Sequence, residues 1–156
     1  MSDTARLTTA AAAKAFILGG NAVFTLVSTK TGTRFTYNVR ASDDGQVHFV
    51  SLLTGPDNTS DFRYIGRIAN DLRFWCGRRF PKPGDVSASA PSAQAFCFAW
   101  EVLYRDRMHQ NLEIWHEGRC ARCNRRLTVP ASIASGFGPE CAGKAGITAM
   151  REDFGA

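Results

Sequence analysis

The sequence predicts an α+β fold: a four-stranded antiparallel meander with a covering helix and a C-terminal zinc-knuckle module. Short runs of alternating apolar and polar residues, separated by turn residues, occupy residues 22–68 and favour strands. A helical repeat of apolar residues follows Pro91. A Cys-x-x-Cys pair, Cys120 and Cys123, is followed by a third cysteine, Cys141, as in small metal-binding modules.

The predicted sheet has strands joined by short turns. The strands are expected at residues 22–28, 34–40, 47–53 and 61–68. Clusters of Gly, Pro, Asn and Asp mark the turns between them, including the pair Asp44-Gly45. Because short turns join antiparallel neighbours, these strands should form a meander. Strict alternation along the fourth strand would place Arg63 and Arg67 on one face of the sheet.

Two helices are expected, one before the meander and one after it. Residues 8–18 are rich in alanine, with Thr8 or Thr9 as the N-cap and glycines as the stop. The second helix begins near Pro91, because proline suits the first turn of a helix. Its predicted core residues follow a helical spacing and are Phe96, Ala99, Trp100, Leu103 and Tyr104, with Arg107 covering the edge. A short strand at residues 112–116 then leads into the cysteine pair.

The organisation that we expect is one compact unit made of two parts. Residues 1–110 should form the sheet domain, and residues 111–156 should form a zinc-binding module packed on it. A chain of 156 residues with 44% apolar residues is large enough to build its own core. The sequence shows neither a secretory signal nor a run long enough to span a membrane, so we expect a cytoplasmic protein. Nothing in it indicates the oligomeric state.

The cysteines point to metal binding. There are five of them, and without an export signal reduced thiols and metal ligation are expected rather than disulfides. The spacing of Cys120 and Cys123 lets both thiolates reach one ion, and Cys141 starts a predicted helix whose positive end favours a thiolate. The predicted cofactor is Zn²⁺; a redox Cys-x-x-Cys or free thiols are the alternatives. Cys76 and Cys97 stand apart and are expected to be buried apolar residues or bystanders.

Tetrahedral zinc needs a fourth ligand, and His116 is the expected one. It stands four residues before Cys120, whereas His109 and Glu140 are weaker candidates. Four protein ligands would close the coordination sphere, so we expect a structural site and not an enzyme. If water held the fourth position instead, Glu140 could serve as the base of a zinc hydrolase.

The cysteine segment also carries a longer motif. It reads Cys120-x-x-Cys123-x-Arg125-x-Leu127-Thr128, then Pro130-x-Ser132, then Gly136-x-Gly138-Pro139-x-Cys141. This motif resembles an uncharacterised zinc-binding family of bacterial phage, plasmid and other mobile-element proteins, over the last third of the chain. The resemblance implies a zinc fold and a mobile-element origin, but no reaction. Asn124 replaces the glycine usual after the second cysteine in that family, and both residues tolerate a left-handed backbone.

Basic residues cluster in the middle of the chain. The net charge is +5, and positions 62–83 hold six basic residues against one acidic residue. Because cations neutralise phosphates and aromatic rings stack on bases, we predict a nucleic-acid-binding accessory protein of a bacterial mobile element. The predicted contact residues are Arg63, Arg67, Arg73, Trp75, Arg78, Arg79 and Lys82. The alternative is a protein-binding inhibitor of the anti-defence type that acts on a host nuclease or nucleic-acid-processing complex, with an acidic protein as the partner. A third interpretation is a purely structural adaptor, in which the aromatics are core residues and the arginines are merely solvated.

Overall fold

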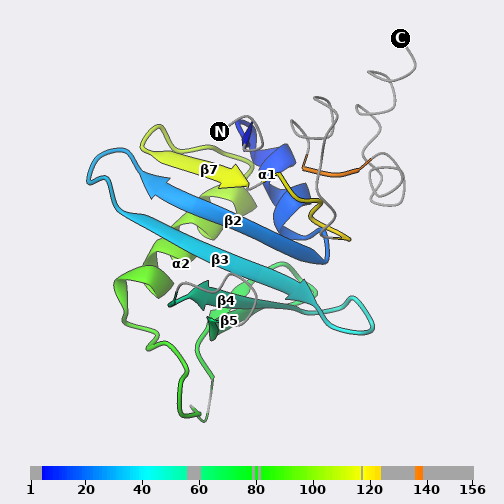
Figure 1. Cartoon of the computed structure of the whole chain (residues 1–156), viewed down its shortest axis with the longest axis vertical. Coiled ribbons are helices and arrows are strands. Elements are labelled where there is room, and N and C mark those ends of the chain that lie inside the picture. Colours follow the sequence, from blue (N-terminus) through cyan, green and yellow to red (C-terminus); the bar gives the residue numbers. More distant parts are fainter. Residues whose placement is uncertain are drawn as a thin grey trace.

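The computed structural model describes residues 5–55, 61–78, 80, 82–116, 118–123 and 136–138. In this part of the chain, one antiparallel sheet has two helices packed on the same face (Figure 1). The strands are β1 (Ala5–Arg6), β2 (Asn21–Ser28), β3 (Arg34–Ala41), β4 (His48–Leu53), β5 (Phe62–Ile68), β6 (Phe74–Cys76) and β7 (Leu112–His116). The helices are α1 (Ala10–Ile17) and α2 (Pro91–Tyr104). This confirms the predicted α+β class.

The sheet is wider than the predicted meander. Its seven strands lie in the order β1-β7-β2-β3-β4-β5-β6, so β2 to β5 form the expected meander and three further strands extend it, within the described residues. The expected count of four strands was therefore too low. β1 and β6 are two and three residues long, too short to show a period in the sequence. β7 was expected as a strand, but its place beside β2 depends on long-range pairing and not on local pattern.

β7 joins the two predicted parts of the chain. It begins the segment 111–156 and pairs along its length with β2 on one side, where Leu26 lies opposite Ile114. On its other side it pairs with β1, where Arg6 lies opposite Trp115. The first residues of the predicted zinc module are therefore part of the sheet itself.

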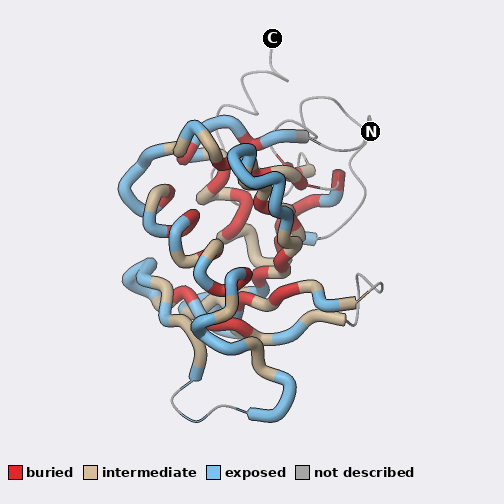
Figure 2. Tube along the Cα trace, turned by 90° about the vertical axis from the view of Figure 1, so that its left-hand side faces the viewer, coloured by how far each residue is buried: buried red, intermediate tan, exposed pale blue. Residues whose placement is uncertain are grey.

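The sheet has one covered face and one open face. Alternate residues of β2, such as Phe24 and Leu26, are buried under the helices, and so are Tyr37 and Val39 of β3. Figure 2 shows the buried segments gathered between the sheet and the helices. Ring contacts connect the layers: Phe16 of α1 meets Phe24 edge-on. The alternate residues on the other face are not covered by any helix in the described part of the chain.

α1 begins and ends where the sequence predicted. The side chain of Thr9 caps it, because Oγ1 accepts a hydrogen bond from the Ala12 N–H at 3.1 Å. The helix ends before Gly19, whose N–H donates to the Phe16 carbonyl at 3.0 Å. Phe16 and Ile17 point into the core. This short helix thus turns directly into β2, which follows at Asn21.

α2 starts with Pro91 at its first position, as predicted. Phe96, Ala99, Trp100 and Leu103 are buried, which confirms the apolar face. The Trp100 Nε1–H also donates to the Leu72 carbonyl at 2.7 Å. Two details of the prediction were wrong: Tyr104, the last helical residue, is 44% exposed, and Arg107 lies beyond the end of the helix. Because α2 ends at Tyr104, its buried apolar face does not extend to Arg107.

Candidate functional site

The Cys-x-x-Cys turn packs against the end of α1. Its Ala121 carbonyl accepts a hydrogen bond from the Asn21 N–H at 2.7 Å, at the start of β2. The Ala121 N–H donates to the Gly136 carbonyl at 2.8 Å. The turn is therefore held between the α1–β2 connection and the Gly136-Phe137-Gly138 segment. We call this region the cysteine corner, defined by residues 116, 118–123 and 136–138.

Close packing fixes the cysteine corner on the core. Phe137 is fully buried, and its ring lies 6.3 Å from that of Phe16. Gly136 has φ +81°, and a Cβ added to it would lie 2.2 Å from the Phe16 ring. A Cβ added to Gly19 would lie 2.7 Å from the Cβ of Ala121. Gly136, the first glycine of the Gly-x-Gly motif, and Gly19 at the α1 stop thus permit this close approach.

Cys120 lies in a setting that favours a thiolate. It is 1% exposed, and its Sγ accepts the Arg122 N–H at 3.4 Å. Burial alone raises the pKa of Cys120, but backbone N–H groups of Cys123, Gly138 and Arg122 outweigh it and lower the pKa. The Cys123 thiol hydrogen-bonds to the same sulfur and is exposed. Backbone donors of this kind would also stabilise a thiolate that ligates a metal.

His116 reaches the cysteine corner from the end of β7. It is 1% exposed, and its ring stacks on Phe16 with centroids 5.2 Å apart. Its Nδ1 accepts the Gly118 N–H at 3.0 Å, which places the proton of the neutral ring on Nε2. A metal ion on either ring nitrogen would therefore replace this bond to Gly118. The role of His116 as fourth ligand stays a prediction.

The remaining predicted donors of the metal centre lie elsewhere. Cys141 and Glu140 are outside the described residues, as is the helix that was expected to begin at Cys141. Within the described residues, no three His, Cys, Asp or Glu side chains gather closely enough to hold a metal ion. His109 lies beyond the opposite end of β7, where its Nδ1 accepts the Asn111 N–H at 3.0 Å. The structure thus shows Cys120 and Cys123 together, and it places the buried His116 at the end of the strand that leads to them.

A row of cations and rings crosses the open face of the sheet. Arg40 of β3 lies opposite Phe49 of β4, Phe49 lies opposite Arg67 of β5, and Arg67 lies opposite Trp75 of β6. Residues directly opposite on antiparallel strands share a face, so these four side chains stand side by side. All four are exposed, with Phe49 at 43% and Trp75 at 51%. We call this set the open-face row; neighbouring strands lie about 4.8 Å apart, so it spans about 14 Å.

A β-bulge separates two of the predicted contact residues. The register of β4 and β5 shifts between Val50 and Ser51, so that Val50 opposes Gly66 while Ser51 opposes Tyr64. Ile65 is the extra residue and turns into the core. Arg67 consequently lies on the open face, whereas Arg63, opposite the buried Leu52, lies on the helix side. The expectation that these two arginines share a face was wrong for this reason.

The other predicted contact residues surround the β6 edge. Arg78 lies over the Tyr64 ring at 3.9 Å and donates from Nε to Asp85 Oδ2 at 2.8 Å. The Asp85 carboxylate also accepts the backbone N–H of Lys82, and this hydrogen bond lowers the pKa of Asp85. Arg73 is exposed beside Asp71, with 3.9 Å between Nε and Oδ2. Arg79 lies outside the described residues.

Two residues of the open-face row were missed by the sequence prediction. Arg40 falls on the polar face of a cleanly alternating strand, and Phe49 alternates with the buried Val50. The alternation could have placed each on the open face. Only the register between strands shows that they are neighbours of Arg67.

Comparison with known proteins adds one finding. The model of a family described as "Family of unknown function (DUF6011)" matches residues 113–146, which include all of β7 except Leu112 and the whole cysteine corner. This confirms the expected likeness of the C-terminal segment to an uncharacterised family. No curated protein matches the chain, and no solved structure matches it. Among the described residues, no helix has the length and apolar character needed to cross a bilayer.

Proposed function

We propose that this chain is a zinc-stabilised protein that binds single-stranded nucleic acid across the open face of its sheet. The open-face row is the observation that carries this proposal. It alternates guanidinium groups with exposed aromatic rings across four neighbouring strands. Sheets that bind single strands use the same combination, in which rings stack on bases while cations meet phosphates.

The charge of the open face favours a polyanion. The strand residues facing that side include four arginines, Arg6, Arg34, Arg40 and Arg67. The one carboxylate among these strand residues, Glu113, is already engaged, because its Oε2 lies 3.8 Å from Arg6 and its Oε1 accepts the Trp115 Nε1–H. A surface on which arginines outnumber carboxylates in this way attracts phosphates from a distance.

Exposed rings explain why a single strand is favoured over a duplex. Phe49 and Trp75 are 43% and 51% exposed, which leaves ring surface available for stacking. The bases of a single strand offer flat faces to such rings, whereas duplex bases are already stacked on each other. The row therefore suits unpaired bases.

Zinc would hold the cysteine corner on the sheet. Cys120 and Cys123 supply two adjacent sulfurs, and the backbone donors around Cys120 suit a thiolate ligand. Cys141 and His116 would complete the four-ligand set that the sequence predicts. Zinc in such a closed site crosslinks the segments that bind it and supplies folding energy, not reactivity. A role in a bacterial mobile element is the context that the sequence resemblance suggests.

The test measures binding of labelled oligothymidine to the purified chain by fluorescence anisotropy, at salt concentrations from about 50 to 200 mM. Wild-type binding should weaken with salt, and Arg67→Ala should reduce the slope by about 0.7, the value for one phosphate contact on a single strand. Trp75→Ala should weaken binding by roughly 1–3 kcal/mol, the worth of one stacked base.

Arg63→Ala is the matched control. Arg63 is an exposed arginine of the same strand, but it lies on the helix side of the sheet. Its replacement should leave affinity and salt slope unchanged. Equal losses from Arg63→Ala and Arg67→Ala would show that binding depends on charge alone and not on the open face. Absence of binding at low salt would reject the proposal and favour an acidic protein partner.

A further inference from the structure

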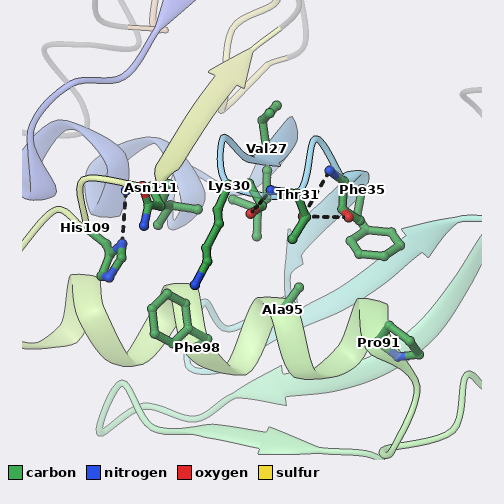
Figure 3. Close-up of a pocket in the computed structure, with 13 residues that line it drawn as sticks. Val27, Lys30, Thr31, Phe35, Pro91, Ala95, Phe98, His109 and Asn111 are labelled. Carbon is green, nitrogen blue, oxygen red and sulfur yellow. Dashed lines mark hydrogen bonds between the residues drawn. The ribbon is translucent and has the colours of Figure 1, made fainter.

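A cavity of about 510 Å³ opens on the helix side of the sheet, where the β2–β3 turn approaches α2 (Figure 3). Its size falls within the range of about 300–1,000 Å³ that small-molecule sites occupy. It lies away from both the cysteine corner and the open-face row.

The wall of this cavity is mainly apolar. Leu26, Phe35 and Leu112 come from the ends of three strands, and Ala95 and Phe98 come from α2. Phe98 is 51% exposed although it is a large apolar residue of the helix, because its ring borders the cavity. Such a wall would gain from contact with an apolar ligand body.

The polar groups at the cavity are cationic or neutral donors. Figure 3 shows the Lys30 side chain extending from the turn toward Phe98 on α2. None of the lining residues is acidic, and among the described residues no carboxylate lies within ion-pair distance of Lys30. His109 stands beside the Phe98 ring, 5.3 Å between centroids, and its Nδ1 is occupied by the Asn111 N–H. The neutral ring therefore keeps its Nε2–H as a donor.

The turn that carries Lys30 has an internally bonded shape. The Gly32 N–H donates to the Ser28 carbonyl at 2.7 Å, and the hydroxyls of Thr31 and Thr33 lie 2.8 Å apart. The Thr31 N–H donates to Ser28 Oγ at 3.4 Å. These bonds fix the backbone of the turn beside the apolar wall, so that mainly the Lys30 side chain has to be ordered on binding.

We propose that this cavity binds a small apolar monocarboxylate. The carboxylate would accept a charge-assisted hydrogen bond from Lys30 and a second bond from His109 Nε2–H, and the apolar body would lie against Phe98 and Phe35. A ligand of this class matches a site that offers positive charge, no carboxylate and an apolar wall. The proposal rests on the cavity alone and is independent of nucleic-acid binding.

The test compares sodium octanoate with its uncharged counterpart 1-octanol, by NMR titration of the full chain with nitrogen-15 labelling. Octanoate should shift the amide signals of the β2–β3 turn and of Ala95 and Phe98. It should bind at least about tenfold tighter than octanol, because a hydrogen bond to a charged group is worth about 1.5–3 kcal/mol. Benzoate in a parallel titration distinguishes a compact aromatic body from an extended chain.

Variants test separately what the charge of Lys30 and the apolar wall of the cavity contribute to binding. Lys30→Met keeps the apolar stem and removes the charge, so octanoate affinity should fall about tenfold, to that of octanol. Lys82 is an exposed lysine outside the cavity, so Lys82→Met is the matched control and should leave octanoate affinity unchanged. Phe98→Ala should weaken the binding of both octanoate and octanol. No octanoate shifts at millimolar concentration, shifts at other residues, or undiminished binding by Lys30→Met would overturn the proposal.

Discussion

The backbone of Gly136 lies directly against the ring of Phe16, at a φ of +81°. A Cβ at this position would come within 2.2 Å of Phe16 Cδ2. Gly136→Ala should therefore lower the free energy of unfolding by roughly 2–5 kcal/mol, from left-handed strain and from overpacking. Urea denaturation followed by tryptophan fluorescence measures this loss.

Gly138→Ala is the control for this prediction, two residues further along. A Cβ on Gly138 meets no described atom within 4 Å, and its φ is not in the left-handed region. Its replacement should change stability by less than about 0.5 kcal/mol. Equal stability of the two variants would mean that the contact between Gly136 and Phe16 contributes nothing.

The cysteine corner should lose its metal when Cys120 is replaced. Elemental analysis of the wild-type chain should give about one zinc per molecule, the stoichiometry of a single four-ligand site. Cys120→Ser should remove it, because this buried sulfur with its backbone donors is the best-placed ligand. The sheet should persist, since most of its core lies between the strands and the two helices and a chain of this size can bury a core without a metal. Cys76→Ser, a cysteine of β6, should keep the metal; a folded wild-type chain without metal would contradict the zinc proposal.

Binding of zinc to His116 should be visible at Gly118. The Gly118 N–H bonds to His116 Nδ1 at 3.0 Å, and this bond cannot persist once a metal occupies one ring nitrogen and the proton moves to the other. Zinc addition to the metal-free chain should therefore shift the Gly118 amide signal and speed its hydrogen exchange. His116→Gln should weaken zinc binding by at least about tenfold if the ring is a ligand. Unchanged affinity would leave His116 as a core residue stacked on Phe16.

The hydroxyl of Tyr37 should stabilise the packing of α2 on the sheet. It donates to the Ser92 carbonyl at 2.6 Å, and burial raises the pKa of Tyr37 far above its usual value. Tyr37→Phe should therefore cost about 0.5–1.5 kcal/mol of folding free energy, the net worth of one hydrogen bond. Tyr104→Phe, at the exposed end of the same helix, should cost nothing measurable in the same urea titration. Equal losses of stability in the two variants would indicate that the buried hydrogen bond of Tyr37 contributes nothing measurable to folding.

Stability should fall in mildly acidic solution through His48. Burial lowers the pKa of His48 below its ordinary 6.5, and its contact with the Leu18 carbonyl at 3.2 Å offsets part of this effect. The unfolded chain therefore takes up a proton before the folded chain does. The contribution of His48 is complete above its ordinary pKa and is lost as the pH falls from there to the lower folded pKa. His48→Gln should flatten the pH dependence of urea unfolding in that window; an unchanged profile would contradict this assignment.

Local features of this protein could be derived from its sequence alone. The cap at Thr9, the start of α2 at Pro91 and the buried face that includes Phe96 and Trp100 depend on residues a few positions apart. The Cys-x-x-Cys turn is local in the same sense. Its spacing predicted two neighbouring sulfurs, and in the structure the Arg122 N–H between the two cysteines donates to Cys120 Sγ at 3.4 Å.

Only the tertiary structure decided which strands meet and in what register. β7 enters the sheet beside β2, although 83 residues lie between Ser28 and Leu112. The bulge at Ile65 moves Arg63 and Arg67 to opposite faces, because one extra residue reverses the side-chain alternation. The open-face row and the Lys30 cavity result from such pairings. The free energy of each strand pairing depends on contacts between distant residues and on how the core is filled, so a local sequence pattern does not predict the pairing.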